Sequence, residues 1–288
     1  MFSFIRHRKI WYILSLLVVL PGVVSIVLQG FNLGIDFTGG NLMEIRAKQN
    51  VAIGDVRAVV EELKYGASDN VQQSGERDYL IRTKNLSETE SAKLVSALNE
   101  KLGGVTLMQN NMVGPVMGRE LAFKAILALL IAAVLMLIYI SYRFEPKQGI
   151  AAVIAIVHDI LVVLGIFSIF RLEVNSTFVA AVLTITGYSI NDTIVIFDRI
   201  RENMRSRRKG ESLEDLVNIS IWQTMTRSIN TILTVMFVLL ALFIIGHSTV
   251  KDFLLALIIG VVTGAYSSVL NASPIWVDLK LLEQKKQA

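Results

Sequence analysis

The sequence predicts an α-helical integral membrane protein with six transmembrane helices and a small α+β ferredoxin-like extracytoplasmic domain between the first two helices. Three observations predict this fold class. First, 53% of the 288 residues are hydrophobic. Second, the apolar residues form six runs, each close to the ~20 helical residues that cross a bilayer. Third, one long polar stretch, residues 30–120, separates the first run from the second.

The six apolar runs are too long and too uniformly apolar for the strands of an outer-membrane barrel, in which apolar and polar residues alternate. The first run ends at Val27–Leu28–Gln29, where no pair of small residues marks a signal-peptide cleavage site. We therefore expect this run to remain in the protein. The predicted spans are Ile10–Leu28, Leu121–Ile140, Ile150–Phe170, Phe178–Phe197, Ile229–Ile245 and Phe253–Leu270.

The polar stretch carries patterns that predict short strands and two helices. Ser87 and Glu90 form the S-x-x-E pattern of a capping box in front of an apolar helical face. In chain order we expect a strand at 41–47, a helix at 51–64, strands at 70–74 and 78–84, a helix at 87–102 and a strand at 105–109. The order β-α-β-β-α-β is typical of a ferredoxin-like domain.

Basic residues predict the orientation of the chain in the membrane. Arg6, Arg8 and Lys9 precede the first run, and a basic group from Arg199 to Lys209 follows the fourth. The positive-inside rule then places both termini and the loop at 198–226 in the cytoplasm. Because topology accounts for this loop, no nucleic-acid partner is expected.

The predicted organisation has three parts. Residues 1–29 form a cytoplasmic N-terminus and the first transmembrane helix, residues 30–120 the extracytoplasmic domain, and residues 121–288 the other five transmembrane helices and a cytoplasmic C-terminus. Within the basic loop, Leu213, Leu216, Val217 and Ile221 share one helical face. This segment fits either an amphipathic helix on the inner membrane surface or a plain connector.

An aspartate inside the fourth run is the main candidate functional residue. Asp192 lies six residues before Asp198, which places it about 9 Å from the inner boundary of the membrane. A charge inside the bilayer costs at least about 2.5 kcal/mol, so it needs a partner, a proton or water. Thr184, Tyr188 and Asn191 form a polar stripe beside it, which lipid cannot satisfy. The sequence therefore predicts ion or proton coupling at Asp192.

The fifth run supplies a candidate partner for this aspartate. Arg227 and Asn230 share one helical face, and antiparallel packing of the fifth helix on the fourth would bring Arg227 to the depth of Asp192. An ion pair that protonation of the aspartate releases is one interpretation. The other is that Arg227 reaches the inner headgroups and serves as a topology anchor.

The third run contains a second ionisable pair, His158 and Asp159. Asp159 is either a further proton-coupling residue or a group that bonds the neighbouring helix backbone. Because adjacent residues of a helix point about 100° apart, we expect no direct contact between the two side chains.

Other motifs point to packing and exclude most chemistry. Gly260, Gly264 and Ser268 form a small-residue face that allows close approach of another helix. There is no cysteine, and no nucleophile–base triad, phosphate-binding loop or metal-ligand spacing is present. We therefore expect a protein that is not an enzyme and has no cofactor, and whose energy comes from an ion gradient or a partner. Protons and sodium both suit a carboxylate inside the membrane.

The sequence resembles the SecF family, subunits of the bacterial SecD–SecF protein-export complex, over essentially its whole length. GIDFTGG alone is shared with SecD, whereas its combination with SINDTIVIFDRIREN points to SecF. The stretches that carry the resemblance are Gly34–Gly40 (GIDFTGG), Val113–Leu121 (VGPVMGREL), Ser141–Phe144 (SYRF), His158–Asp159, Gly187–Asn203 (GYSINDTIVIFDRIREN) and Thr226–Thr234 (TRSINTILT).

The resemblance implies half of an RND-type transporter in the bacterial cytoplasmic membrane. It implies that the chain pairs with SecD, associates with the SecYEG channel and uses the proton-motive force to help complete preprotein export. Asp192 and Arg227 match the positions of the family's proton-path residues. The expected contacts are thus SecD, SecYEG, the translocating preprotein and membrane lipids.

Two alternatives stay open at this point. The chain could be one half of an RND-type exporter of small molecules or lipids, although such exporters usually hold both halves in one chain. It could also be a scaffold that stabilises a membrane complex without conducting ions, with Asp192 and Arg227 as a fixed pair.

Overall fold

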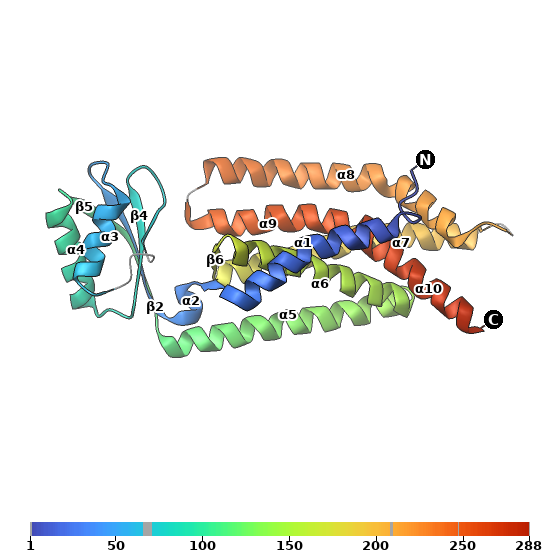
Figure 1. The fold of residues 1–288 in the computed structure, drawn as a ribbon, viewed down its shortest axis with the longest axis horizontal. Coiled ribbons are helices and arrows are strands. Elements are labelled where there is room, and N and C mark those ends of the chain that lie inside the picture. Colours follow the sequence, from blue (N-terminus) through green and yellow to red (C-terminus); the bar gives the residue numbers. More distant parts are fainter. Residues whose placement is uncertain (1, 66–70, 208–209, 247, 288) are drawn as a thin grey trace.

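The computed structural model is elongated, with a helical bundle at one end and a small domain at the other (Figure 1). It describes residues 2–65, 71–207, 210–246 and 248–287. Both ends of the chain lie at the end of the bundle that is remote from the small domain (Figure 1). The first residue of the strand predicted at 70–74 and the basic residues Arg208 and Lys209 lie outside the described residues.

Within the described residues, six helical segments are long and apolar enough to cross a membrane, which confirms the predicted fold class. They extend beyond the apolar runs because polar residues at their ends continue the helix into the interface. The first five are α1 (Arg8–Gln29), α5 (Pro115–Arg143), α6 (Pro146–Ile169), α7 (Ser176–Arg205) and α8 (Leu213–Ile245).

The sixth span is interrupted by a wide turn. Helix α9 (Ser248–Ser267) continues through a π-helical segment, Ser268–Ala272, into α10 (Ser273–Gln287). A π-helical turn holds one residue more than an α-helical turn, so it rotates the helix that follows. After this segment the Trp276 side chain is directed into the core, where it is fully buried.

Helices α6 and α7 form the centre of the bundle. Half of the most apolar stretch of α6 is buried within the chain, whereas none of that of α5 is. The backbones of α1 and α6 approach closely where Gly22 faces Gly165, because a Cβ built on Gly165 would lie 2.7 Å from the Gly22 Cα. Helix α5 therefore exposes its apolar side chains on the surface of the chain, whereas α6 and α7 contribute buried polar groups to the interior.

The domain between α1 and α5 has the predicted ferredoxin-like topology. Its sheet has the order β3-β4-β2-β5, and every neighbouring pair is antiparallel. Side chains of α3 and α4 pack with those of the sheet in one apolar core. The elements are β2 (Gly40–Ala47), α3 (Ile53–Glu62), β3 (Val71–Gln73), β4 (Asp78–Thr83), α4 (Glu88–Lys101) and β5 (Val105–Val113).

The capping box predicted at the start of α4 is present. The Ser87 side chain accepts a hydrogen bond from the Glu90 N–H, and the Glu90 carboxylate accepts one from the Ser87 N–H at 2.8 Å. These bonds, first the one from the Ser87 backbone and then the one from its hydroxyl, lower the pKa of Glu90. The cap thus depends on the charged form of this side chain.

A short connection ties the domain to the helices. After α1, strand β1 (Asn32–Leu33) pairs in parallel with β6 (Glu173–Val174), which lies between α6 and α7. The next turn, α2 (Ile35–Thr38), carries Asp36, whose carboxylate accepts hydrogen bonds from the backbone and the hydroxyl of Ser176 at the start of α7. The root of the domain is therefore attached directly to α7.

The basic loop is shorter than the segment 198–226. Helix α7 continues to Arg205, and α8 begins at Leu213 and runs unbroken into the fifth span. The apolar face that contains Leu216 and Ile221 packs into the protein core with Trp276. The shared helical face was predicted, and of the two interpretations left open, the structure contradicts an amphipathic helix on the inner membrane surface, because α10 and α7 cover this face.

Candidate functional site

Asp192 lies on α7 where that helix packs against α8. The Ser228 hydroxyl donates a hydrogen bond to Asp192 Oδ1 at 2.5 Å. The other carboxylate oxygen, Oδ2, is buried and has no hydrogen-bond partner. The side chain as a whole is half-buried, so the carboxylate is held by one donor and leaves one oxygen unsatisfied.

Arg227 and Asp192 line the same cavity, which has a volume of about 140 Å³. Antiparallel packing of α8 on α7 thus brings them to one depth, as the spacing predicted. However, among the described residues no ion pair joins the two side chains. Ser228, the next residue of α8, provides the direct contact instead, because it faces α7 and is buried while Arg227 is exposed.

The predicted polar stripe only partly reaches this cavity. Tyr188 lines it and donates a hydrogen bond to the Thr231 carbonyl at 3.1 Å, and Asn191 also lines it. Thr184 donates instead to the Ala180 carbonyl of its own helix, and Asn230 lies outside the cavity lining.

One face of α7 and α8 exposes polar groups at the depth of the bilayer. Thr184, Asn191, Arg227 and Asn230 are all exposed on the surface of this chain. Hydrocarbon cannot hydrogen-bond with such groups, so in a membrane this face needs cover from another polar protein surface or from water.

Asp159 is the most heavily bonded carboxylate inside the bundle. It is 1% exposed, and its Oδ2 accepts hydrogen bonds from the hydroxyls of Ser189 on α7 and Ser267 on α9, both at 2.7 Å. Its Oδ1 lies 3.1 Å from His158 Nδ1. Asp159 therefore joins α6, α7 and α9 through side-chain contacts.

The expectation that His158 and Asp159 do not touch was wrong. The angle of about 100° describes the directions in which adjacent side chains leave the helix, whereas an imidazole and a carboxylate extend far enough to meet. The His158 ring also stacks on Tyr266, with 5.9 Å between the ring centroids, and its Nε2 is buried without a hydrogen-bond partner.

Ser189 connects the two acidic groups. It lines the Asp192 cavity and donates to Asp159, so one hydroxyl separates the cavity from the buried carboxylate. Gly264 allows this arrangement, because a Cβ at that position would lie 2.9 Å from the Ser189 Cβ.

The small-residue face of the last span lies against α7. Gly260 faces the Ile185 side chain so closely that a Cβ at this position would clash with it. The Ser268 hydroxyl is 2.8 Å from that of Thr193. Two glycines and one serine therefore set the distance between α9 and α7.

Sequence reasoning missed the hydroxyl groups that hold the two aspartates. Ser228, Ser189 and Ser267 lie inside apolar helices, where Ser228 adjoins the predicted Arg227 and Ser189 lies three residues before Asp192. For Ser228 and Ser189, a hydroxyl within a turn of a charged residue in an apolar helix was a usable signal, whereas Ser267 has no charged residue within a turn.

Comparisons with known proteins agree with this architecture. The family model described as "Protein export membrane protein SecD/SecF, C-terminal" matches residues 94–282, and a SecD/SecF GG motif model matches residues 24–51. The protein translocase subunit SecF of Thermobaculum terrenum is 42% identical, covering 96% of this chain and 94% of its own. The protein translocase subunit SecF of Acidaminococcus fermentans is 40% identical, and the alignment covers 96% of each of the two chains.

Longer relatives contain a match to this chain as one part. The protein translocase subunit SecDF of Bacillus subtilis is 40% identical over 99% of this chain, which spans only 39% of that protein. The crystal structure of SecDF, a translocon-associated membrane protein from Thermus thermophilus, superposes with a TM-score of 0.89 at 35% identity. The superposition includes 97% of this chain but only 38% of the SecDF chain.

Proposed function

This chain belongs to the SecD/SecF family of protein-export membrane proteins, and from this membership we propose how it acts. It is a multi-pass membrane protein whose relatives are protein translocase subunits, and we propose a transport role without catalytic activity of its own. We propose that it works with SecD in the bacterial cytoplasmic membrane and uses the proton-motive force to assist preprotein translocation through SecYEG. Both termini then face the cytoplasm and the α+β domain faces the opposite side.

The observation that carries the proposal is the incomplete bonding of Asp192. Its Oδ2 lacks a hydrogen-bond partner, and Arg227 lines the same cavity without an ion pair to it. A carboxylate fixed for structural reasons alone would have its oxygens satisfied, as those of Asp159 are. The Asp192 cavity is therefore suited to a group that gains and loses a proton.

The physical steps follow from the contacts. A charged Asp192 attracts Arg227 across the cavity, while a proton on Oδ2 removes that attraction and leaves only the bond from Ser228. The two states thus differ in the force between α7 and α8. One charge that crosses 100 mV releases about 2.3 kcal/mol, which is enough to shift two packings of similar stability.

A shift of α7 would act on the α+β domain through direct contacts at the start of this helix. Helix α7 begins at Ser176, which is bonded to Asp36 at the root of the domain. Arg82 of β4 also forms an ion pair with Glu173 of β6, three residues before the start of α7 at Ser176. We propose that these contacts transmit movement of α7 to the domain that holds the emerging polypeptide.

SecD is the proposed cover for the exposed polar face of α7 and α8. Relatives in which both parts form one chain, such as the SecDF of Bacillus subtilis, support this association. Thr184, Asn191 and Asn230 would then be buried at the subunit interface beside the Asp192 cavity. The coupling ion is proposed to be the proton, with sodium as the alternative that the experiment below also tests.

The test is potential-dependent export with Asp192→Asn. In inverted membrane vesicles that contain SecD and SecYEG, we expect the variant to keep ATP-driven insertion but lose the acceleration that the proton-motive force provides. Asp198→Asn is the matched control, because Asp198 is an exposed carboxylate further along α7 that pairs with Arg143 at 3.8 Å. Repeating the measurement with a sodium gradient identifies the ion.

Unchanged potential dependence in the Asp192→Asn vesicles would remove the coupling role. The chain would then be a scaffold of the translocase, with Asp192 as a structural residue.

A further inference from the structure

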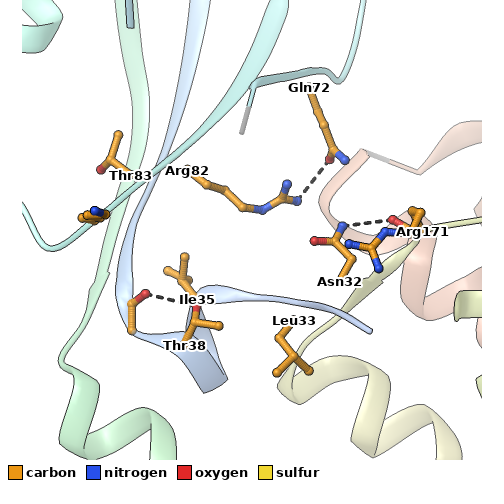
Figure 2. A pocket seen from close by; sticks show the side chains of 10 residues that line it. Asn32, Leu33, Ile35, Thr38, Gln72, Arg82, Thr83 and Arg171 are labelled. Atoms are coloured by element: carbon orange, nitrogen blue, oxygen red, sulfur yellow. Dashed lines mark hydrogen bonds between the residues drawn. The ribbon is translucent and has the colours of Figure 1, made fainter. Parts of the chain in front are cut away.

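A cavity of about 660 Å³ lies at the junction between the domain and the membrane helices (Figure 2). Its lining contains three basic residues, Arg82, Lys84 and Arg171, and no carboxylate. Figure 2 shows the Arg82 side chain reaching from β4 toward Asn32 and Arg171 across this space. The basic side chains thus come from the domain on one side and from the α6–α7 connection on the other.

The positive charge of this cavity is not fully compensated. Arg82 bonds Gln72 and pairs with Glu173, while its Nε is buried without a partner. Asp252 adds a second carboxylate close to Glu173 and Arg82. Lys84 is exposed, and no ion pair to it or to Arg171 is found among the described residues. The two carboxylates are near Arg82 and do not line the cavity, so Lys84 and Arg171 retain donors for an anion.

Arg171 occupies a backbone position that favours glycine. Its φ is +54°, in the left-handed region just after the end of α6. Glycine adopts this conformation without the steric cost that a Cβ brings. The side chain donates to the Gln29 carbonyl at 2.8 Å, which uses only one of its nitrogens. Its remaining donors face the cavity that it lines.

An apolar cavity of about 290 Å³ adjoins the basic one. It lies between α5, α6 and α7, with Ala125, Leu129, Leu164 and Phe178 in its lining. Leu33 lines both cavities. Figure 2 shows the Leu33 side chain directed away from Asn32 and Arg171, on the other side of the β1 strand. A basic chamber and an apolar groove are thus separated by one residue.

The junction of the two cavities coincides with the edge of the membrane-spanning region. Helix α1 ends at Gln29, α6 ends at Ile169 and α7 begins at Ser176, and all three points lie at the domain end of the bundle (Figure 1). The basic chamber is therefore at the height of lipid headgroups, and the apolar groove is at the height of acyl chains.

We propose that this composite site binds one anionic phospholipid of the leaflet next to the domain. The phosphate is held by Arg171, Lys84 and the free donors of Arg82, and one acyl chain lies in the groove between α5, α6 and α7. Arginine and lysine provide the charge-assisted hydrogen bonds that phosphate accepts best. The proposal rests on the membrane-spanning fold and not on the export role, so either can fail without the other.

The test is lipid binding to the full-length protein in detergent, measured by native mass spectrometry. We expect phosphatidylglycerol to bind roughly tenfold more tightly than phosphatidylcholine with the same acyl chains, a difference of about 1.4 kcal/mol. Arg171→Gly combined with Lys84→Gln should abolish this preference, and the glycine relieves the backbone strain so that folding is kept. Ala125→Trp, which fills the groove, should weaken binding of both lipids.

Lys9→Gln is the matched control, because it removes an exposed charge at the opposite end of α1 and should leave the preference unchanged. Inorganic phosphate serves as the second probe. If millimolar phosphate displaced the lipid and Ala125→Trp had no effect, the cavity would be a site for a free anion. An equal effect of Lys9→Gln and of the double variant would mean that lipid is attracted only by net charge, and either result overturns the proposal.

Discussion

Asp159 and Asp192 differ in how completely their carboxylate oxygens are bonded. Both oxygens of Asp159 have partners, from three different helices counting its own, whereas Asp192 has a donor on Oδ1 only. The same residue type can therefore serve two purposes here. Asp159 bonds groups on three helices, whereas Asp192 is left with a free oxygen beside Arg227.

This contrast yields a prediction for Asp159. Replacement by alanine leaves the Ser189 hydroxyl without its acceptor and Ser267 with only the Gly264 carbonyl of its own helix, which we expect to lower the free energy of unfolding by about 2–5 kcal/mol. Asp159→Asn retains an acceptor oxygen and should cost less. The measurement is thermal unfolding of the purified protein in detergent, together with export in vesicles.

Export separates a positioning role from a proton-carrying role. If Asp159 only positions α7, the asparagine variant keeps potential-dependent export, with a reduced melting temperature. Complete loss of potential dependence in a stable Asp159→Asn protein would instead make Asp159 part of the proton path.

At the residue scale, the sequence predicts acidic positions well and their partners poorly. Asp192 is conspicuous because a charge in an apolar run is costly. Its contact with Ser228 spans thirty-six positions of the chain and depends on the rotation of α8 about its axis. No pattern within one helix contains that rotation, which is why the sequence offered Arg227 as a candidate partner and did not indicate the neighbouring Ser228.

Helix ends and helix contacts in this protein depend on single side chains. Helix α4 starts at a capping box, and α1 and α6 meet where glycine faces glycine. Each contact can be removed without disturbing the rest of its helix, so each gives a prediction about one element.

The first such prediction concerns the stability of the start of α4 at acidic pH. Because hydrogen bonds from Ser87 lower the pKa of Glu90 in the folded domain, the stabilisation is complete above the pKa of the unfolded side chain. It disappears as the pH falls through the lowered folded value. We therefore expect hydrogen exchange of the first turn of α4 to accelerate at acidic pH, relative to the end of the helix.

Glu90→Gln is the control for this effect, since an amide keeps the acceptor oxygen but does not titrate in this range. The capping interpretation would fail if the variant showed the same acid-dependent exchange as the unaltered protein.

The second prediction concerns the contact between α1 and α6. A methyl group added by Gly165→Ala would meet the Gly22 backbone at 2.7 Å, so the helices must separate, at a cost of about 1–3 kcal/mol. Gly187→Ala adds the same methyl group to α7 where no atom lies within 4 Å. We expect Gly165→Ala to lower the melting temperature in detergent and Gly187→Ala to leave it unchanged or raise it; equal effects would show that the close approach is not needed.

Local sequence patterns predict the positions of helices and strands more reliably than they predict where a helix continues unbroken or is interrupted. Apolar runs located the spans, and the S-x-x-E pattern located the start of α4, because both depend on residues within a few turns. The unbroken path of α8 from Leu213 to Ile245 and the π-helical segment Ser268–Ala272 were not predicted. Both depend on packing against α7 and α10, which the local sequence does not contain.

On the scale of the whole molecule, the domain is held by a small number of polar contacts. Asp36 bonds Ser176, Arg82 pairs with Glu173, and β1 pairs with β6. All of these contacts fall on the connection between α6 and α7. Any change in the position of α7 therefore acts on the domain at one point.

We predict that Asp36→Ala uncouples the domain from α7. It removes the acceptor of the two Ser176 donors and leaves Asp192 and its cavity unaltered. We expect the rate of export driven by the proton-motive force to fall several-fold, while the rate of basal export without this force stays the same. The readout is preprotein protection in vesicles, with distances between spin labels on the domain and on α5 as a second measurement.

Asp55→Ala is a suitable control, because Asp55 is an exposed carboxylate on α3 within the domain. Equal losses in the two variants would mean that the domain tolerates no change of charge and that the contact to α7 has no special role.

The number of spans and the distribution of basic residues predicted where the two ends of the chain lie, but not how the domain is attached. An even number of spans and the basic loops place both ends on one side, and both ends do lie at the same end of the bundle. The attachment of the domain to α7 was not predicted, since the parallel pairing of Asn32 with Glu173 joins segments far apart in the chain.

The π-helical segment has one more consequence, which concerns insertions and deletions. Ser268–Ala272 accommodates one residue beyond the α-helical count, and removal of one residue there would let α9 and α10 merge into a regular helix. Each residue of an α-helix turns the chain by about 100°, so the deletion would swing the Trp276 indole out of the core and move Lys280 away from Glu145. The rotation of α10 about its axis thus depends on one additional residue in the π-helical segment. Deletion of that single residue would turn an entire face of α10 away from its present partners.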